Sequence, residues 1–210
     1  MRTSIWIFYL LLTGGIQAQQ IILLRNPSFE GQPGAGIEIP GWNDCGPITE
    51  SPPDLQPGYF GCDLPPILGQ TYLGLATRST GTWESVGQKL STPLQEGKKY
   101  AFSLWLAHSE KYSSPVGIGR ESKLFDTPIR LRIWGGESNC ERGELLVQTP
   151  IIKNTDWMPF DFFLSPKKAN WTHIILEAYY PDDSVATEIL TLTNGNLLID
   201  DCSAIVQIEQ

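Results

Sequence analysis

Three stretches of the sequence carry aromatic and charged side chains at every second position, the spacing that places side chains on one face of a β-strand. Within residues 129–134 and 171–180, apolar side chains occupy one face, whereas arginine, tryptophan, histidine, glutamate and tyrosine occupy the other. The stretch 99–107 sets a tryptophan opposite its apolar residues in the same way. If the three strands are neighbours in one sheet, these side chains form a single surface. Its members are Trp105, Arg130, Arg132, Trp134, His173, Glu177 and Tyr179.

Such a surface has the chemistry that a sugar requires. Flat aromatic rings stack on the apolar face of a pyranose, and guanidinium, carboxylate and imidazole groups form directed hydrogen bonds with its hydroxyls. The alternative is that long loops fold over this face. In that case the tryptophans form a second, smaller core, and the arginines pair with Glu177.

Catalytic patterns are sparse. The two histidines, His108 and His173, occur in strand contexts, and the sequence contains neither a GxSxG nucleophile motif nor an HExxH metal motif. Glycosidase carboxylates come from distant strands and leave no local signature, so a glycoside hydrolase remains an alternative. The candidate carboxylate pairs are Glu177 with Glu144, and Asp182 with Asp183. Because a solvated loop is the simpler interpretation of the two aspartates, we expect a protein that is not an enzyme.

Short strand-like runs rich in aromatic and β-branched residues alternate with turn residues along most of the chain, and no segment has a sustained helical period. About nine strands are expected, at 21–24, 72–76, 82–90, 99–107, 128–135, 144–147, 156–164, 171–180 and 197–206. The long segment 26–69 has no strand pattern. These features predict an all-β fold, a two-sheet antiparallel jelly-roll sandwich. Its core should include Tyr100, Phe102, Leu104 and Leu106, which share one face.

Composition limits the partners. The 210 residues have 15 Lys and Arg against 23 Asp and Glu, a formal net charge of −8. This acidic balance repels phosphate backbones, so it argues against nucleic acid and against anionic membranes as partners.

The first residues have the pattern of a secretory signal. Arg2 precedes an apolar run at residues 5–12, and a small residue, Ala18, follows it. We therefore expect residues 1–18 to be a cleaved signal peptide and residues 19–210 to form one domain. No later run is long enough for a helical membrane span. The expected location is extracellular or at the cell surface.

If the protein is exported, its four cysteines are expected to form disulfides, because an even number of cysteines usually pairs in an oxidising environment. Three connectivities are possible for Cys45, Cys62, Cys140 and Cys202. We favour Cys45 with Cys62, which bracket a loop rich in proline and glycine, and then Cys140 with Cys202. Two free buried thiols remain possible for the second pair.

Several short motifs resemble those of galactose-binding-like jelly-roll domains. They are residues 24–30 (LRNPSFE), 40–42 (PGW), 72–75 (YLGL), 88–90 with 97–102, and 198–201 (LIDD). Within that group the pattern is similar to carbohydrate-binding modules for cellulose and xylan, and it also resembles modules in secreted surface proteins of gliding bacteria. The likeness spans nearly all of residues 19–210, although its motifs mark a fold more reliably than a ligand.

The resemblance also implies a structural calcium ion between the first and last strands. The matching residues are Ser28, Glu30, Asp200 and Asp201. Oxygen ligands from both chain ends suit Ca²⁺. Adjacent strand residues point to opposite faces, so the two aspartates are not expected to be equivalent ligands.

These observations favour a secreted, non-catalytic protein that binds a polysaccharide or surface glycan through the aromatic and arginine face of one sheet. A structural or adhesion module that binds another cell-surface protein is the alternative. A glycoside hydrolase is the second alternative.

Overall fold

The computed structural model describes residues 19–116, 121–180 and 193–208. The expected signal peptide at 1–18 and the aspartates at 182 and 183 lie outside the described residues. All regular secondary structure in the described residues is β. The strands are β1 (Ile21–Ile22), β2 (Asn43–Asp44), β3 (Asp54–Gln56), β4 (Tyr72–Thr77), β5 (Ser85–Leu94), β6 (Lys99–Ala107), β7 (Ser113–Val116), β8 (Glu121–Leu124), β9 (Thr127–Pro128), β10 (Arg130–Gly136), β11 (Glu144–Gln148), β12 (Met158–Leu164), β13 (Trp171–Tyr179), β14 (Gly195–Asp200) and β15 (Ile205–Ile208).

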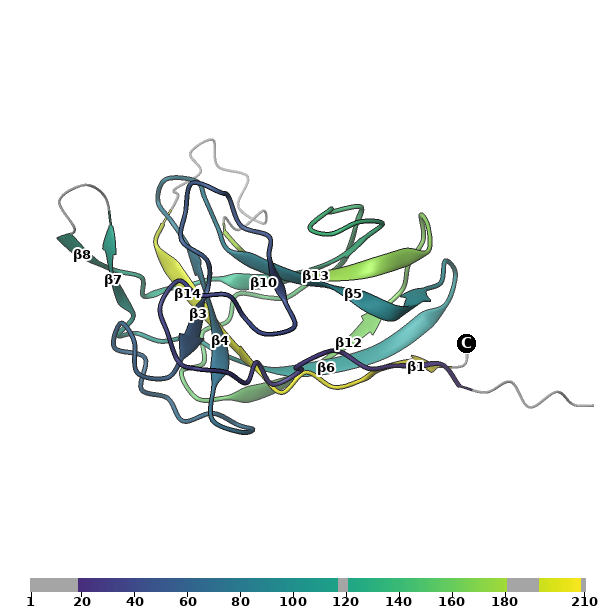
Figure 1. The fold of residues 1–210 in the computed structure, drawn as a ribbon, viewed down its shortest axis with the longest axis horizontal. Coiled ribbons are helices and arrows are strands. Elements are labelled where there is room, and N and C mark those ends of the chain that lie inside the picture. Colours follow the sequence, from purple (N-terminus) through teal and green to yellow (C-terminus); the bar gives the residue numbers. More distant parts are fainter. Residues whose placement is uncertain (1–18, 117–120, 181–192, 209–210) are drawn as a thin grey trace, which may run out of the picture.

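Two main sheets pack face to face (Figure 1). The larger sheet has the order β1-β15-β6-β14-β4-β3, with β12 on the other edge of β6 and β9 beside β14. The smaller sheet has the order β11-β10-β13-β5-β2. Apart from the short parallel pair of β9 and β14, the strand pairs are antiparallel. The predicted all-β sandwich is confirmed.

The core lies between the two sheets, where alternate residues of each strand point inward. The β6 face of Tyr100, Phe102, Leu104 and Leu106 is buried, as predicted. Leu131 and Ile133 of β10 meet this layer from the smaller sheet and are completely buried. Strand alternation therefore identified the core face correctly on both sheets.

One predicted strand, 197–206, is wrong. The chain forms β14, turns at Asp201 with a φ of 46°, and continues as β15. Both strands lie along the same edge of β6. Strand β14 pairs with residues 105–107 of β6, and β15 pairs with residues 99–101. A positive φ interrupts the extended backbone, so a continuous strand is impossible there.

The segment 26–69 contains β2 and β3, which the sequence did not predict, and it contributes one edge strand to each sheet. Its start is fixed by Asn26, whose side chain accepts a hydrogen bond from the Glu30 amide and donates to the carbonyl of Pro40. The Trp42 indole donates to the Asn26 carbonyl, and its ring stacks on Phe29 at 5.1 Å. The motifs at 24–30 and 40–42 therefore fold the first loop against the sandwich.

The disulfide prediction is also wrong. Cys45, just after β2, is bonded to Cys140 in the connection between β10 and β11, whereas Cys62 and Cys202 are free and buried. The β10–β11 connection crosses the outer face of the smaller sheet to reach the β2 edge, where Asn139 also hydrogen-bonds Asn43. The bond therefore joins residues 95 positions apart. Sequence proximity does not reveal this, because it depends on sheet order.

Candidate functional site

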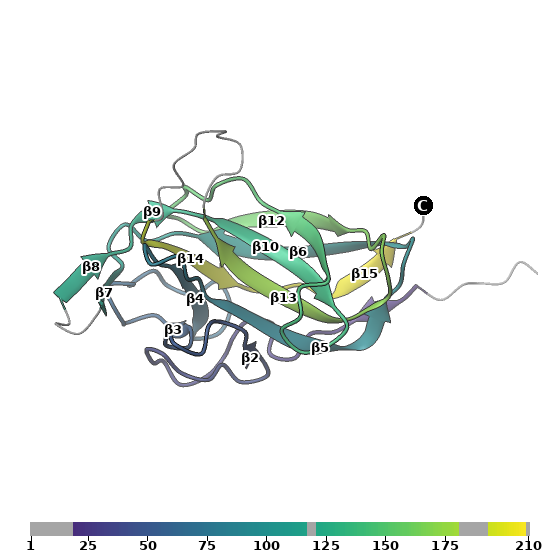
Figure 2. The same ribbon diagram turned by 90° about the horizontal axis from the view of Figure 1, so that it is seen from above.

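The outer face of the smaller sheet brings most of the predicted site residues together. Strands β10 and β13 are adjacent and antiparallel, and they lie side by side in Figure 2. Their register places Arg132 opposite Glu177 and Arg130 opposite Tyr179. Trp134 follows on the same face of β10, because residues two apart share a face.

Trp105 does not belong to this surface. It lies on β6, in the larger sheet, where it is opposite Pro159 on one side and Asp200 on the other. The prediction of one surface across all three strands is therefore wrong. Alternation identifies which side of a strand is polar, but it does not say which sheet the strand joins.

Two other predicted residues lie on the smaller sheet at a distance from its centre. His173 is opposite Lys89 and Gly136, and its Nδ1 lies 2.9 Å from the Thr172 hydroxyl. Burial, followed by the nearby Lys89 charge, lowers the pKa of His173. Arg130, at the opposite end of β10, is buried.

A cavity of about 510 Å³ opens on this outer face. We call it the outer-face cavity. Strands β10 and β13 form its floor, and the turns before β5 and after β2 form its walls. Its lining residues are Cys45, Gly46, Pro47, Gly81, Thr82, Trp83, Arg132, Trp134, Arg142 and Glu177.

Glu177 is the buried polar centre of the outer-face cavity, with 2% of its residue surface exposed. It accepts a hydrogen bond of 3.0 Å from the Trp134 indole and forms a close ion pair with Arg142. Arg142 also donates to the Ser85 hydroxyl at 2.9 Å. Both oxygens of the Glu177 carboxylate therefore have a partner, and Arg142 links this carboxylate to Ser85 of β5.

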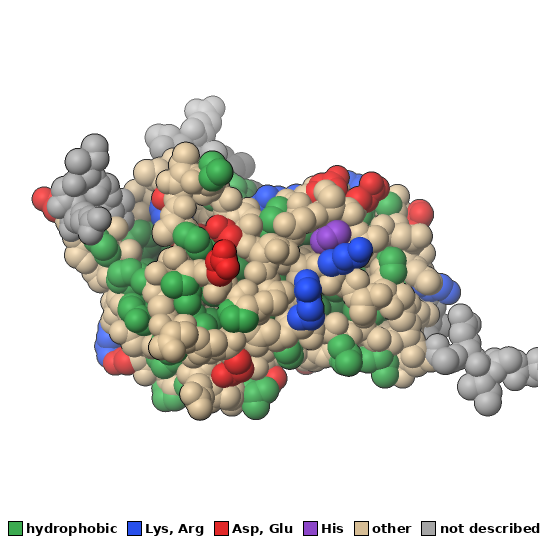
Figure 3. Space-filling model, in the orientation of Figure 1, with side chains coloured by type: hydrophobic (Ala, Val, Ile, Leu, Met, Phe, Trp, Pro, Cys, Tyr) green, Lys and Arg blue, Asp and Glu red, His purple; other side chains and the backbone are tan. Residues whose placement is uncertain are grey.

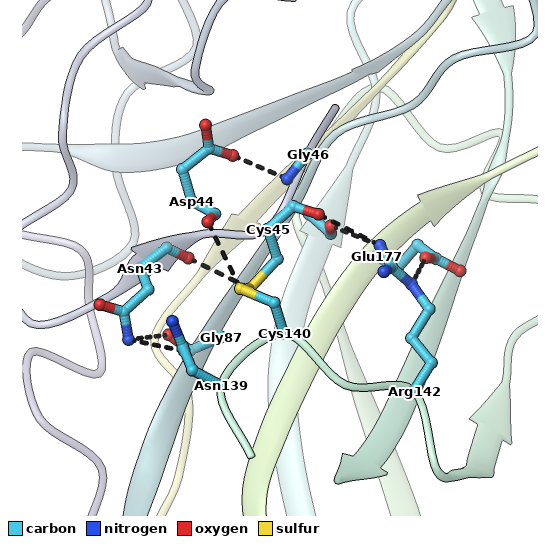
Figure 4. Close-up of a disulfide and its surroundings, with 10 residues drawn as sticks. Asn43, Asp44, Cys45, Gly46, Gly87, Asn139, Cys140, Arg142 and Glu177 are labelled. Carbon is cyan, nitrogen blue, oxygen red and sulfur yellow. Dashed lines mark hydrogen bonds and ion pairs between the residues drawn. A yellow bond between two sulfur atoms is a disulfide. The ribbon is translucent and has the colours of Figure 1, made fainter. Parts of the chain in front are cut away.

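Arg142 was missed by the sequence analysis, in which the alternative of a loop-covered face paired the arginines of the sheet with Glu177. It lies in the β10–β11 connection, two residues after Cys140. Its position over Glu177 depends on that connection crossing the sheet, and Figure 4 shows the guanidinium, the carboxylate and the disulfide together. No local sequence pattern signals this placement.

A strip of rings and one guanidinium runs along the floor of the outer-face cavity and beyond it. Trp83 meets Tyr179 edge to face, with ring centroids 5.3 Å apart. The Arg132 guanidinium carbon lies 3.1 Å from the Tyr179 ring centroid and 5.9 Å from that of Trp134. Arg132 is further held by Gln148, whose side-chain oxygen accepts from its Nε at 2.6 Å. Such a pre-ordered strip can stack on a flat apolar ligand face while offering N–H donors.

The Cys45 half of the disulfide lines the outer-face cavity. The sulfur of Cys45 lies over Gly87 of β5, where an added Cβ would come within 3.1 Å of it and within 3.2 Å of the Ile175 side chain. A glycine at this position therefore lets the bridge lie directly on the sheet.

The alternative of a loop-covered face is partly correct. Ile175, on the same face as Glu177, is completely buried, and Arg130 is buried as well. Trp83, Arg132 and Trp134 are only half-buried. The outer face therefore combines a small covered cluster with an open cavity beside it.

The residues expected to hold calcium are only partly suited to it. Asp200 is completely buried, and its oxygens accept hydrogen bonds from the amides of Ile67, Leu68 and Asp201. These three bonds use most of the acceptor capacity of the carboxylate, which disfavours Asp200 as a calcium ligand. Glu30 fits better, because its Oε1 is buried without a partner among the described residues. Calcium remains a prediction that involves Glu30, Asp201 and Ser28, the last of which is buried.

The carboxylate proposed as a catalytic partner of Glu177 has a structural role. Glu144 accepts hydrogen bonds from the Trp171 indole and from the amides of Lys167 and Lys168. Burial alone would raise its pKa, but these hydrogen bonds outweigh burial and lower it. Glu144 does not line the outer-face cavity.

Charge is dispersed over the molecule. On the described part of the face in Figure 3, acidic and basic side chains are scattered among uncharged ones, without a continuous basic surface. In the described ranges, no helix is long and apolar enough to cross a membrane.

No protein-family model matches the chain, and no curated protein sequence matches it. Solved structures do match. A cyclase from Fischerella sp. TAU is similar over 91% of this chain and 98% of its own, with a TM-score of 0.54 and 12% identity. The arabinose-bound α-L-arabinofuranosidase MgGH51 matches 89% of this chain but only 26% of its own, with a TM-score of 0.55 and 12% identity. The K2 cleaved adhesin domain of Lys-gingipain matches 92% of this chain and 99% of its own, with a TM-score of 0.50 and 9% identity.

Carbohydrate-binding modules of families 4, 16 and 22 also match, with TM-scores of 0.41, 0.45 and 0.47. The matches with TM-scores of 0.50 or more show that the fold resembles that of the cyclase, of part of the arabinofuranosidase chain and of the K2 adhesin domain. The expected likeness to surface proteins of gliding bacteria finds no support in these matches. At such low identities the likeness establishes the fold alone.

Proposed function

We propose that this protein is a non-catalytic carbohydrate-binding protein and that the outer-face cavity is its glycan-binding site. The observation that carries the proposal is the combination of two half-buried indoles, Trp83 and Trp134, with the Arg132 guanidinium around one open cavity. This arrangement provides what a sugar ring needs, an aromatic surface bordered by fixed hydrogen-bond donors.

The site is built before any ligand arrives. The Trp134 indole is oriented by Glu177, and Arg132 is oriented by Gln148 and the Tyr179 ring. Since these side chains are already ordered, a sugar would bind without the entropy cost of immobilising them.

We infer the absence of glycosidase chemistry from the same cavity. Hydrolysis of a glycosidic bond usually requires two carboxyl groups flanking the bond. Among the described residues, the outer-face cavity is lined by a single carboxylate, Glu177, and Arg142 and Trp134 engage it. The cavity is therefore suited to holding a sugar rather than to cleaving it.

Secretion is part of the proposal. The Cys45–Cys140 disulfide is a bond that persists in oxidising compartments. The apolar run at residues 5–12 is typical of a secretory signal. A glycan of the cell surface or of the surrounding medium is then the accessible partner.

A glycan array, followed by calorimetry on the best glycan, tests the proposal. Trp134→Ala should reduce affinity by roughly five- to thirtyfold, because it removes a stacking surface that contributes on the order of 1–2 kcal/mol. Trp105→Ala is the matched control: it removes an indole from the other sheet and should leave affinity unchanged. If no glycan on the array binds, or if both variants lose affinity equally, the result would contradict the glycan site and favour a protein partner.

A further inference from the structure

A second cavity, of about 490 Å³, lies near one edge of the larger sheet and shares no lining residue with the outer-face cavity. We call it the acidic cavity. Strands β3, β4 and β7 contribute residues to it, and these strands lie at the same end of the molecule in Figure 1. Its charged and aromatic lining residues are Asp54, Phe60, Arg78, Glu84, Tyr112 and Phe125.

Two carboxyl groups of the acidic cavity are almost completely buried. Asp54 and Glu84 expose 4% and 3% of their surface. Asp54 accepts hydrogen bonds from the Gly36 amide and, at close range, from the Tyr112 hydroxyl. Glu84 accepts from the Ala76 amide at 2.9 Å and forms a close ion pair with Arg78.

Carboxyl groups outnumber cationic groups around this cavity among the described residues. Arg78 contacts both Glu84 and Glu50, the latter at 3.3 Å, whereas the Asp54 carboxyl accepts hydrogen bonds from the Gly36 amide and the Tyr112 hydroxyl. Burial raises the pKa of Asp54, and it raises that of Glu84 to about 8 despite the adjacent arginine. Each carboxylate would be easier to ionise with a further cation in the cavity.

Arg78 has a hydrogen-bonding capacity that the protein does not use. Its side chain is nine-tenths buried and lines the acidic cavity. Nη2 and Nε contact carboxylates, but Nη1 is buried without a hydrogen-bond partner among residues 19–116, 121–180 and 193–208. A buried guanidinium N–H without a partner is costly, and a ligand oxygen would satisfy it.

Aromatic rings complete the walls. Tyr112 lies between Phe60 and Phe125, with ring centroids 5.6 Å and 5.7 Å away. Ring faces attract cations, most strongly where the surroundings are desolvated. The acidic cavity thus combines two buried carboxyl groups, aromatic walls and one unsatisfied donor.

We propose that the acidic cavity binds a small hydroxylated amine, whose ammonium group pairs with Asp54 and Glu84 and whose oxygen accepts from Arg78. The carbon skeleton of the ligand would pack against Phe60 and Phe125. This site is independent of the proposed glycan site, because it differs in location and in ligand charge.

Calorimetry with a non-sugar probe tests this proposal without involving the glycan site. The probe is trans-4-aminocyclohexanol, and its matched neutral analogue is trans-1,4-cyclohexanediol. We expect the amine to bind at neutral pH at least tenfold more tightly than the diol, because only the amine supplies a positive charge. Equal binding of the two compounds, or no binding of either, would overturn the proposal.

Variants locate the binding. Asp54→Asn keeps the size and the acceptor oxygen but removes the charge, so affinity for the amine should fall at least tenfold. Asp161→Asn, an exposed position on β12, is the matched control and should leave affinity unchanged. If Asp54→Asn does not fold, Ser114→Trp replaces it, since a bulky ring from the β7 wall fills the cavity and should abolish binding. Unchanged affinity in a folded Asp54→Asn or Ser114→Trp protein would refute this location.

Discussion

At the residue scale, buried ionisable groups dominate the chemistry of this molecule. Glu177 and Glu84 are both buried, and each forms an ion pair with an arginine. They differ in whether the sequence predicted them as site residues. Glu177 was predicted from strand alternation. Glu84 was missed, because it immediately precedes β5 and its partners, Arg78 and the Ala76 amide, follow from the turn between β4 and β5.

Glu84 gives the protein a pH-dependent stability. Its pKa rises from 4.5 to about 8 on folding, so the native state binds more protons than the unfolded state between these values. The free energy of unfolding should therefore fall as pH rises through this window, by on the order of 5 kcal/mol from this group. Glu84→Gln should flatten the dependence, as measured by urea unfolding at a series of pH values. The exposed variant Glu110→Gln serves as the control, and an unchanged slope in Glu84→Gln would show that Glu84 titrates normally.

At the element scale, the crossing of the β10–β11 connection over the smaller sheet organises the outer face. It carries Cys140 to the β2 edge and Arg142 to Glu177. The same crossing decides between the two interpretations left open by the sequence. It covers Ile175 and Glu177 but stops short of Trp83 and Trp134, which remain half-buried.

The disulfide should therefore matter for both stability and the outer-face cavity. In Cys45→Ser/Cys140→Ser, loss of a cross-link between residues 95 positions apart should cost up to about 5 kcal/mol. For a domain of this size, that corresponds to a fall in Tm of up to roughly 10–20 °C. Differential scanning calorimetry measures the shift, and affinity for the glycan should fall with it. A non-reduced digest that links Cys45 to a different cysteine would contradict this arrangement.

At the scale of the whole molecule, the first and last strands of the described residues meet on the larger sheet, where β1 pairs with β15. Cys202, which follows the turn at Asp201, donates its amide to the Pro27 carbonyl near the start of the chain. These contacts join the first loop to the last strands. They also place Ser28 and Glu30 in the region where the calcium resemblance puts its site.

The calcium prediction is tested at this scale. If Glu30 contributes to a calcium site, a chelator should lower Tm, and Glu30→Gln should abolish that effect. Thermal melts with and without EDTA measure the difference, and calcium added back should restore the wild-type Tm. A melting curve that EDTA leaves unchanged would contradict the predicted structural calcium site.

The sequence by itself determined the fold class and the direction of most side chains. Alternation between apolar and polar residues is local, so it correctly assigned the core face of β6 and the outer face of β10 and β13. The same local reasoning gave the approximate bounds of the longer strands, for example 99–107, which β6 matches.

Only the tertiary structure decided which strands are neighbours. Sheet order placed Trp105 apart from Trp134, joined Cys45 to Cys140 rather than to Cys62, and gathered Asp54, Arg78 and Glu84 around one cavity. These relations link residues far apart in the chain, and they arise from how two sheets and their loops pack. A pattern with a period of two residues carries no information about such packing.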